Sequence, residues 1–254
     1  MSAAEEIKSV KDLVSAEEWQ LRVDLAATYR LVAMHGWDDM IFTHISVRIP
    51  GPEHHFLINP YGMLFEEITA SSLVKIDLEG NIVMDSPYFV NPAGFTIHSA
   101  IHAAREDAQC VLHVHTDDGV AVSAQKDGLL PLSQPAMLVS PQLAYHDYEG
   151  VALNLDERER LVADIGDKNL LMLRNHGTLA VGESCALAFI GIYFLERACT
   201  SQVRALTAKP NMPSKAALET TAEQSTGLFM QGIDKLAWPA LLRKLDRTDM
   251  SYRN

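Results

Sequence analysis

Two histidines stand two residues apart in the segment CVLHVHTDDG, residues 110–119. Alternate residues of a β-strand point to the same face, so a strand here would present His113 and His115 side by side. Imidazole nitrogen binds zinc readily, and a catalytic zinc site takes three protein ligands and keeps one position open. The spacing is compatible with a metal site, although two hydrogen-bonded histidines of an ordinary protein core would fit the same pattern.

The best candidate for a third ligand is His176 in the segment RNHG. It stands beside Gly177 at a predicted turn between two strands, where a side chain can project from the end of a sheet. Two more histidines, His98 and His102, are four residues apart and share one face of a predicted helix. His98 is a candidate for proton transfer, although packing of helix histidines on a sheet is the commoner use of such residues.

Helices and short strands are interspersed along the chain around these histidines. Apolar periodicity predicts helices over residues 16–35, from Pro92 onward, over TDDGVAVSAQ, over LDERERLVADIG and from 183 to about 208. Strands are predicted in THISVRI, HFLI, the hairpin SLVKIDLEGNIVM, the histidine segment and NLLMLRNHGTLAVG, whereas AYHDYEG is expected to be a solvated loop. We therefore expect a mixed α/β layer fold with much antiparallel pairing over residues 16–208, followed by a helical tail over 209–254.

Composition limits the partners that this chain is expected to have. It has 254 residues, 48% of them hydrophobic, and a formal net charge of −12 without a cluster of basic residues. This acidity argues against nucleic acid and anionic membranes as partners. The most apolar run, CALAFIGIYFL, is too short to cross a bilayer, no secretory signal is visible, and three scattered cysteines form no disulfide framework. A cytoplasmic protein is expected.

The chain resembles the class II aldolase/adducin family over about residues 21–206. The resemblance is carried by YRLVAMHGWDD, THISVRI, ITASSLVKIDLEGNIV, GFTIHSAIHAAR, VLHVHT, VSAQKDGLLPLSQ and LRNHGTLAVGE. It implies a three-layer α/β/α sandwich around a mixed, mostly antiparallel sheet. It also implies a divalent metal, usually zinc, on His113, His115 and His176, a small-molecule substrate, and a homo-oligomer, usually a tetramer with sites at its subunit interfaces.

The sequence departs from the aldolases of that family near the predicted metal. The position of their catalytic glutamate falls on Gly94, so the carboxylate expected to move protons is missing. His98 is the candidate to replace it. Positions that match their phosphate-binding loops fall on Pro92, Ala93, His44 and Tyr61. Proline and alanine offer no hydroxyl to a phosphate, and His44 and Tyr61 remain as candidate substrate-binding residues.

Two functions from different classes follow from this pattern. The first is a lyase dependent on zinc or another divalent metal, which cleaves a C–C bond or decarboxylates a small non-phosphorylated hydroxy- or oxo-acid. The second is a catalytically silent module, because several of the shared phrases are closer to the head domain of adducin, which is a non-enzymatic cytoskeletal module. The three histidines favour the lyase, whereas Gly94 and the lost phosphate contacts favour the module. We favour the lyase.

Overall fold

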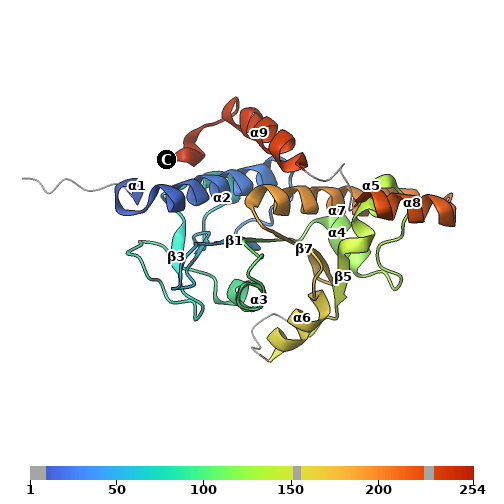
Figure 1. The fold of residues 1–254 in the computed structure, drawn as a ribbon, viewed down its shortest axis with the longest axis horizontal. Helices are drawn as coiled ribbons and strands as arrows, with labels where there is room; N and C mark the ends of the chain where they lie inside the picture. The colour runs from blue at the N-terminus through green and yellow to red at the C-terminus, as the bar shows by residue number, and fades with distance from the viewer. Residues whose placement is uncertain (1–9, 151–155, 226–231) are drawn as a thin grey trace, which may run out of the picture.

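The computed structural model describes residues 10–150, 156–225 and 232–254, apart from the side chains of residues 92–95 (Figure 1). Seven strands form one sheet in the order β3-β2-β1-β4-β7-β6-β5. Neighbouring strands are antiparallel, except that β5 and β6 are parallel. The strands are β1 (His44–Arg48), β2 (Phe56–Ile58), β3 (Val74–Ile76), β4 (Cys110–Val114), β5 (Leu143–His146), β6 (Leu170–Leu173) and β7 (Gly177–Gly182). The expected mixed, mostly antiparallel sheet is confirmed.

Helices cover both faces of this sheet. In Figure 1, α2 (Ala16–Met34) and α7 (Cys185–Ala205) lie side by side on one face, whereas α3 (Pro92–Ala104) and α6 (Glu157–Ile165) lie on the other. The expected three-layer sandwich is therefore confirmed. The remaining helical elements are α1 (Val10–Leu13), α4 (Asp117–Ser123), α5 (Gln134–Val139), α8 (Lys215–Ser225), α9 (Ile233–Asp246) and the 3₁₀ turns η1 (Phe65–Glu67), η2 (Ser140–Gln142) and η3 (Ser251–Arg253).

Side-chain caps set where the two long helices begin. The hydroxyl of Ser15 accepts a hydrogen bond from the backbone N–H of Glu18 at 3.0 Å and starts α2. The hydroxyl of Ser184 does the same for the N–H of Leu187 at 3.2 Å, so α7 begins at Cys185, two residues after the predicted start. Such caps satisfy N–H groups that have no partner within the helix, which typically stabilises the helix by about 1 kcal/mol.

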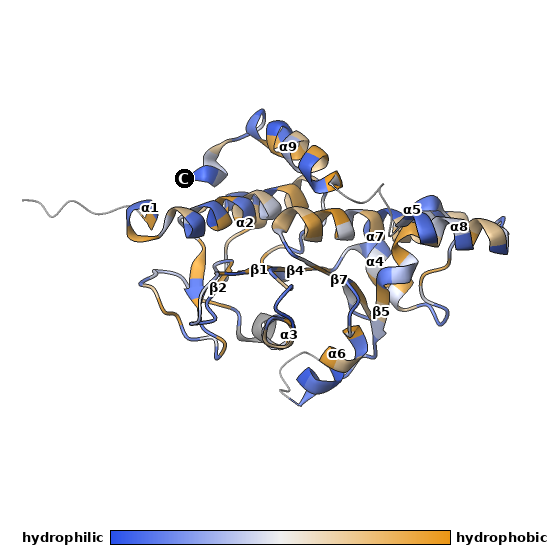
Figure 2. Ribbon diagram, in the orientation of Figure 1, coloured by the Kyte–Doolittle hydropathy of each residue, from blue (hydrophilic) through white to orange (hydrophobic). Residues whose placement is uncertain are grey.

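Alternation along the central strands separates two cores. Cys110, Leu112 and Val114 of β4 belong to the larger apolar cluster under α2 and α7, whereas Val111 belongs to the cluster with residues of α3 and α6. Figure 2 shows the hydrophobic residues along α2 and α7, and mostly hydrophilic residues on the outer turns of α6. Because residues i and i+2 share a face, His113 points to the same side as Val111, toward α3.

One local prediction was wrong, and another was confirmed only in part. The segment AYHDYEG is not all loop, because its first three residues belong to β5, which pairs in parallel with β6 from Leu143↔Leu170 onward. A parallel neighbour joined through a distant helix leaves no short-range turn signal. The predicted hairpin at 72–84 forms in part: Ile76 and Ile82 make an antiparallel bridge, and the N–H groups of Val83 and Asp77 donate to the carbonyls of Lys75 and Asn81, both at 3.0 Å. Its second arm stays outside the sheet, and Ile82 and Val83 are exposed.

The C-terminal segment packs back onto the sandwich through α9, which contacts α2 and α7 (Figure 1). The indole N–H of Trp238 donates to the carboxylate of Asp24, and Arg30 forms an ion pair with Asp249 at 3.1 Å. Tyr252 is fully buried. The predicted boundary after residue 208 stays a prediction. Within the described ranges, no helix has both the length and the apolar character that a membrane span requires.

Candidate metal centre

Three histidine side chains converge at one end of the central strands. The Nε2 atoms are 2.8 Å apart between His113 and His115, 3.0 Å between His115 and His176, and 3.2 Å between His113 and His176. His113 is buried, and the other two are partly exposed. Imidazole nitrogens bound to one tetrahedral zinc would be about 3.3 Å apart, given Zn–N distances of about 2.0–2.1 Å. The group could therefore hold a metal ion with small adjustments of the rings.

Adjacent strands bring the three residues together. His113 lies on β4, His115 follows directly after that strand, and His176 lies in the turn between β6 and β7. Strands β4 and β7 are neighbours, so this turn falls beside the end of β4. A Cβ atom at Gly177 would lie 2.5 Å from the carbonyl oxygen of Val114 and about as close to two of the rings as van der Waals contact allows, at 3.2 and 3.3 Å. Glycine is therefore required after His176.

Fixed acceptors determine which nitrogen of two rings faces the centre. Nδ1 of His113 contacts the backbone carbonyl oxygen of Thr178 at 2.8 Å, and Nδ1 of His115 contacts the carboxylate of Asp39 at 3.1 Å. Both oxygens can only accept, so both Nδ1 atoms carry the hydrogen. In the neutral rings each Nε2 atom then carries a lone pair and no hydrogen. The two Nε2 atoms are 2.8 Å apart, so their lone pairs repel and no hydrogen bond forms between them. A cation between them would relieve this repulsion.

Burial keeps the imidazoles of His113 and His176 in the neutral form that binds metals. It lowers the pKa of His113 well below the usual value, and the neighbouring His176, His115 and His44 lower it further. Burial, followed by the proximity of His115, lowers the pKa of His176 to about 4. Neutral imidazole is the form that coordinates a metal, so no proton has to be displaced from these two rings at neutral pH.

A buried carboxylate supports the backbone behind the centre. Glu196 of α7 is 1% exposed and accepts hydrogen bonds from the hydroxyls of Thr116 and Thr178. Thr116 follows His115, and the carbonyl of Thr178 holds His113. Burial raises the pKa of the Glu196 carboxyl, while its two hydroxyl donors act in the opposite direction. Glu196 therefore ties the ends of β4 and β7 to one helix.

The family model described as the class II aldolase and adducin N-terminal domain matches residues 23–203. The chain belongs to the class II aldolase and adducin family. A protein of Caulobacter vibrioides whose name places it with the class 2 aldolases is 65% identical over 246 residues, 96% of each chain. Alpha-adducin of Rattus norvegicus is 49% identical over 189 residues, which are 73% of this chain and 26% of that one.

A solved structure supports the same fold. The L-fuculose 1-phosphate aldolase of Glaciozyma antarctica PI12 superposes with a TM-score of 0.80, covering 99% of this chain and 97% of that one at 26% identity. Members of the class II aldolase family generally depend on a divalent metal. The three histidines predicted from the sequence form the only group of three or more His, Cys, Asp or Glu side chains, within the described part of the chain, that could hold one.

The other predicted site residues of this class II aldolase family member lie in different surroundings. His98 of α3 is 1% exposed, and its ring lies against that of His44, with the two centroids 4.2 Å apart. His44 is 7% exposed and lies 6.0 Å from the ring of His113. Tyr61 is exposed at the surface, where its N–H donates to the carbonyl of Phe89 at 2.8 Å. The structure thus gathers His44 and His98 beside the three histidines, and no described contact joins Tyr61 to them.

Pro92, Ala93 and Gly94 form the first turn of α3, as expected for a proline at the first helical position. Their side-chain surroundings lie outside what the structure describes. The missing glutamate at position 94 and the lost phosphate contacts therefore stay predictions.

Three contributors to the centre were missed from the sequence. Asp39 stands in a short turn 76 residues before its partner His115, and Thr178 acts through a backbone carbonyl, so neither left a pattern to read. Glu196 did leave one. It is a charged residue on the face of α7 that also carries Ile192 and Cys199, both fully buried. A carboxylate on such a face needs hydrogen-bond donors, which is a signal that sequence inspection could use.

Proposed function

We propose that this protein is a lyase that depends on a divalent metal, zinc being favoured, and acts on a small non-phosphorylated hydroxy- or oxo-acid. The reaction is cleavage of a C–C bond or decarboxylation. The observation that carries the proposal is the pair of Nε2 lone pairs on His113 and His115, 2.8 Å apart and fixed by Thr178 and Asp39. These lone pairs support a bound cation, and the partial exposure of His115 and His176 supports access for a substrate.

His113, His115 and His176 would hold the ion in this proposal. A bound divalent ion supplies Lewis-acid polarisation of a substrate carbonyl, which lowers the barrier to breaking the adjacent bond. His98 is proposed to accept and return the proton that such a cleavage displaces. His44 and Tyr61 are proposed to contact the substrate, with His44 between His98 and His113.

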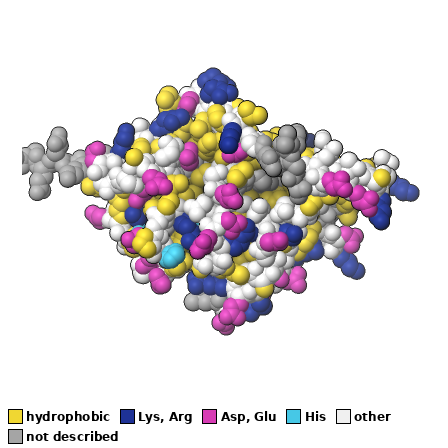
Figure 3. All heavy atoms as spheres, viewed as in Figure 1, with side chains coloured by type: hydrophobic (Ala, Val, Ile, Leu, Met, Phe, Trp, Pro, Cys, Tyr) yellow, Lys and Arg dark blue, Asp and Glu magenta, His cyan; other side chains and the backbone are white. Residues whose placement is uncertain are grey.

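Residue types at the positions that match the family's phosphate-binding loops support a substrate without phosphate. Pro92 and Ala93 bring no hydroxyl where aldolases of the family bind a phosphate, and His44 is nearly buried against another imidazole. The opposing observation is the likeness to an L-fuculose 1-phosphate aldolase over almost the whole chain. Acidic and basic side chains are interspersed over the face in Figure 3, which gives no support for a polyanion as the partner.

A catalytically silent, adducin-like assembly module is the second candidate. The 49% identity to alpha-adducin supports it, as does the glycine at position 94. The same module could retain a metal site for structural reasons.

Turnover measurements separate the two candidates. Zinc-loaded protein would be incubated with a panel of non-phosphorylated hydroxy-acids and oxo-acids and with L-fuculose 1-phosphate, and released carbonyl compounds and CO₂ would be measured. We expect turnover of a non-phosphorylated acid that is lost in His113→Ala and after chelation, and none of the sugar phosphate. Efficient cleavage of L-fuculose 1-phosphate would contradict the substrate class. No turnover of any compound by metal-loaded protein would favour the module.

Assembly into a homotetramer is proposed from the family resemblance, since closed symmetry is the usual outcome for homo-oligomers. Light scattering at micromolar concentrations tests it. A mass equal to the chain mass of 28.1 kDa at every concentration would contradict it.

A further inference from the structure

A second group of polar side chains is buried between the sheet and α3. His44 and Ser46 of β1 alternate with apolar residues that face α2, so both point to the α3 side. His98 and His102 point back from α3, one turn apart. The hydroxyl oxygen of Ser46 lies 2.7 Å from Nδ1 of His98 and 2.7 Å from Nε2 of His102. Ser46 therefore joins the two imidazoles.

The backbone fixes the direction of this chain of hydrogen bonds at its far end. Nδ1 of His102 lies 2.8 Å from the carbonyl oxygen of Ala108, which can only accept, so Nδ1 carries the hydrogen. Burial lowers the pKa of His102 to about 3, and its ring stacks on Phe56. A neutral ring with hydrogen on Nδ1 has a lone pair on Nε2. Ser46 must donate its one hydroxyl hydrogen to that lone pair.

The donor role of Ser46 toward His102 also determines which group donates in its contact with His98. With its hydrogen committed to His102, the Ser46 oxygen can only accept at the other contact, so Nδ1 of His98 donates to it. Burial lowers the pKa of His98 well below the usual value, which keeps this ring neutral too. Nε2 of His98 consequently carries a lone pair and no hydrogen. This atom is buried and has no hydrogen-bond partner among the residues that the structure describes.

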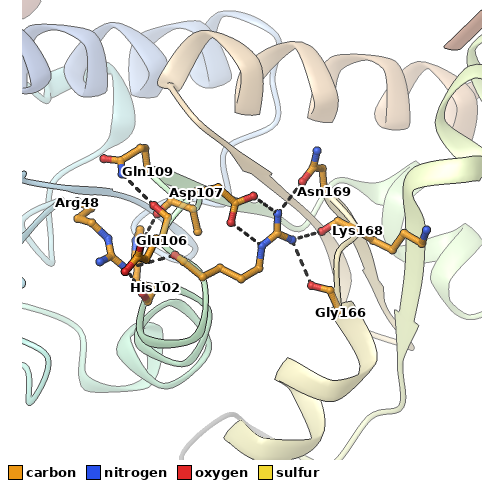
Figure 4. Close-up of polar contacts among 10 residues, drawn as sticks. Arg48, His102, Glu106, Asp107, Gln109, Gly166, Lys168 and Asn169 are labelled. Atoms are coloured by element: carbon orange, nitrogen blue, oxygen red, sulfur yellow. Dashed lines mark hydrogen bonds and ion pairs between the residues drawn. The ribbon is translucent and has the colours of Figure 1, made fainter. Parts of the chain in front are cut away.

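The His102 end of the arrangement is anchored to neighbouring elements. Figure 4 shows the guanidinium of Arg48, on the same face of β1 as Ser46, donating to the backbone carbonyls of His102 and Arg105 at the end of α3. Arg105 in turn contacts Asp107, the carbonyls of residues 166 and 168, and the side-chain oxygen of Asn169 at 2.9 Å. The end of α3 is thereby held against β1 on one side and the start of β6 on the other. These contacts hold Ser46 and His102 close to one another.

We infer that Ser46 and His102 are positioning residues that hold the hydrogen of His98 on Nδ1 and keep its Nε2 as a hydrogen-bond acceptor next to His44. The expected donor is an O–H group, either water or a substrate hydroxyl. This inference deepens the proposed function. A catalytic role for His98 rests on the proposed lyase activity. The arrangement itself stands on the carbonyl of Ala108 and two contacts of 2.7 Å. An unbonded polar atom in a buried position is costly unless something else requires it.

Histidine tautomers can be measured without substrate. Two-bond ¹H–¹⁵N spectra of ¹⁵N-histidine-labelled, metal-free full-length protein distinguish hydrogen on Nδ1 from hydrogen on Nε2, and His98→Gln assigns the signals. We expect wild-type His98 almost wholly as the Nδ1–H form. Ser46→Ala should convert most of it to the Nε2–H form, because the acceptor at Nδ1 is lost. Ser46→Thr keeps the hydroxyl and should restore the wild-type pattern.

Ser99→Ala is the matched control, since Ser99 is a buried serine next to His98 whose hydroxyl donates to the carbonyl of Thr96 at 3.3 Å. It should leave the His98 signals unchanged. Hydrogen on Nε2 of His98 in the wild-type protein would overturn the inference, even if Ser46→Ala did not fold. Unchanged signals in folded Ser46→Ala would overturn it as well. Because neither result depends on turnover, a failure of the lyase proposal would be seen separately.

Discussion

The carboxylate of Asp39 accepts a hydrogen bond from Nδ1 of His115 at 3.1 Å, and this contact decides which nitrogen of His115 faces the other histidines. Without the carboxylate, the ring could place hydrogen on Nε2 and donate toward its neighbours. Asp39 is held in a turn by the N–H of Phe42, which donates to the Asp39 carbonyl at 2.8 Å. Asp39, although distant in the chain, thus leaves Nε2 of His115 without a hydrogen and able to bind a cation.

Metal content is the first prediction. Purified protein should carry about one divalent ion per chain, because three imidazole nitrogens converge on one point. His113→Ala should carry far less, whereas His55→Ala, which changes a histidine outside the centre, should match the wild type. Elemental analysis of the three proteins measures this. Equal metal in wild type and His113→Ala would contradict the assignment of the centre.

Removal of the Asp39 carboxylate should weaken metal binding without removing a ligand. Partners that orient a ligating histidine typically contribute about 10–100-fold in metal affinity. We expect a loss of that size in Asp39→Ala, measured by competition with a chelator at fixed pH. Asp38→Ala removes an exposed carboxylate one residue away and should change little. Equal losses in both variants would point to a general charge effect instead of orientation of His115.

Glu196 should make stability depend on pH. Its folded-state pKa is raised above 4.5 by burial, so between these two values the folded protein keeps a proton that the unfolded chain has released. Unfolding then releases a proton, and stability should fall as pH rises through the folded-state pKa, by about 1.4 kcal/mol for each unit of pKa difference. Glu196→Gln removes this dependence.

Urea unfolding of wild type and Glu196→Gln at about pH 5 and about pH 8 tests this sign. The stability of the wild type relative to the variant should be lower at the higher pH. The difference in unfolding free energy between wild type and Glu196→Gln could instead stay constant between the two pH values, or grow in favour of the wild type. Either result would mean that the hydroxyls of Thr116 and Thr178 keep the folded-state pKa of Glu196 at or below its pKa in the unfolded chain.

A carboxylate restored at position 94 should strengthen metal binding. Gly94 is the third residue of α3, where glutamate suits the helix N-terminus, so Gly94→Glu should fold. If the position faces the centre, an added anionic ligand should raise apparent metal affinity by about tenfold or more, which is about 1.4 kcal/mol. Chelator competition measures it, with Ala103→Glu at the exposed end of the helix as the control. Unchanged affinity in folded Gly94→Glu would mean that position 94 does not face the metal.

Local sequence patterns were sufficient to predict those features that are determined by residues close together in the chain. The spacing of His113 and His115 placed them on one face of a strand, and Gly177 marked the turn that carries His176. The helix predicted over 16–35 from its apolar periodicity is present as Ala16–Met34. The family phrases predicted the layer order and the sheet type.

The sequence by itself therefore determined the three candidate metal ligands and the elements that carry them, because strand alternation, turn chemistry and helix periodicity are local rules. Only the tertiary structure decided which nitrogen of each histidine in and beside the centre is open. Which nitrogen of His115 faces inward depends on Asp39, and which nitrogen of His98 stays open depends on Ser46 and on a carbonyl beyond the end of α3. Hydrogen bonds of this kind join residues from separate elements, and a backbone carbonyl has the same chemistry in every residue, so no pattern in the chain encodes them.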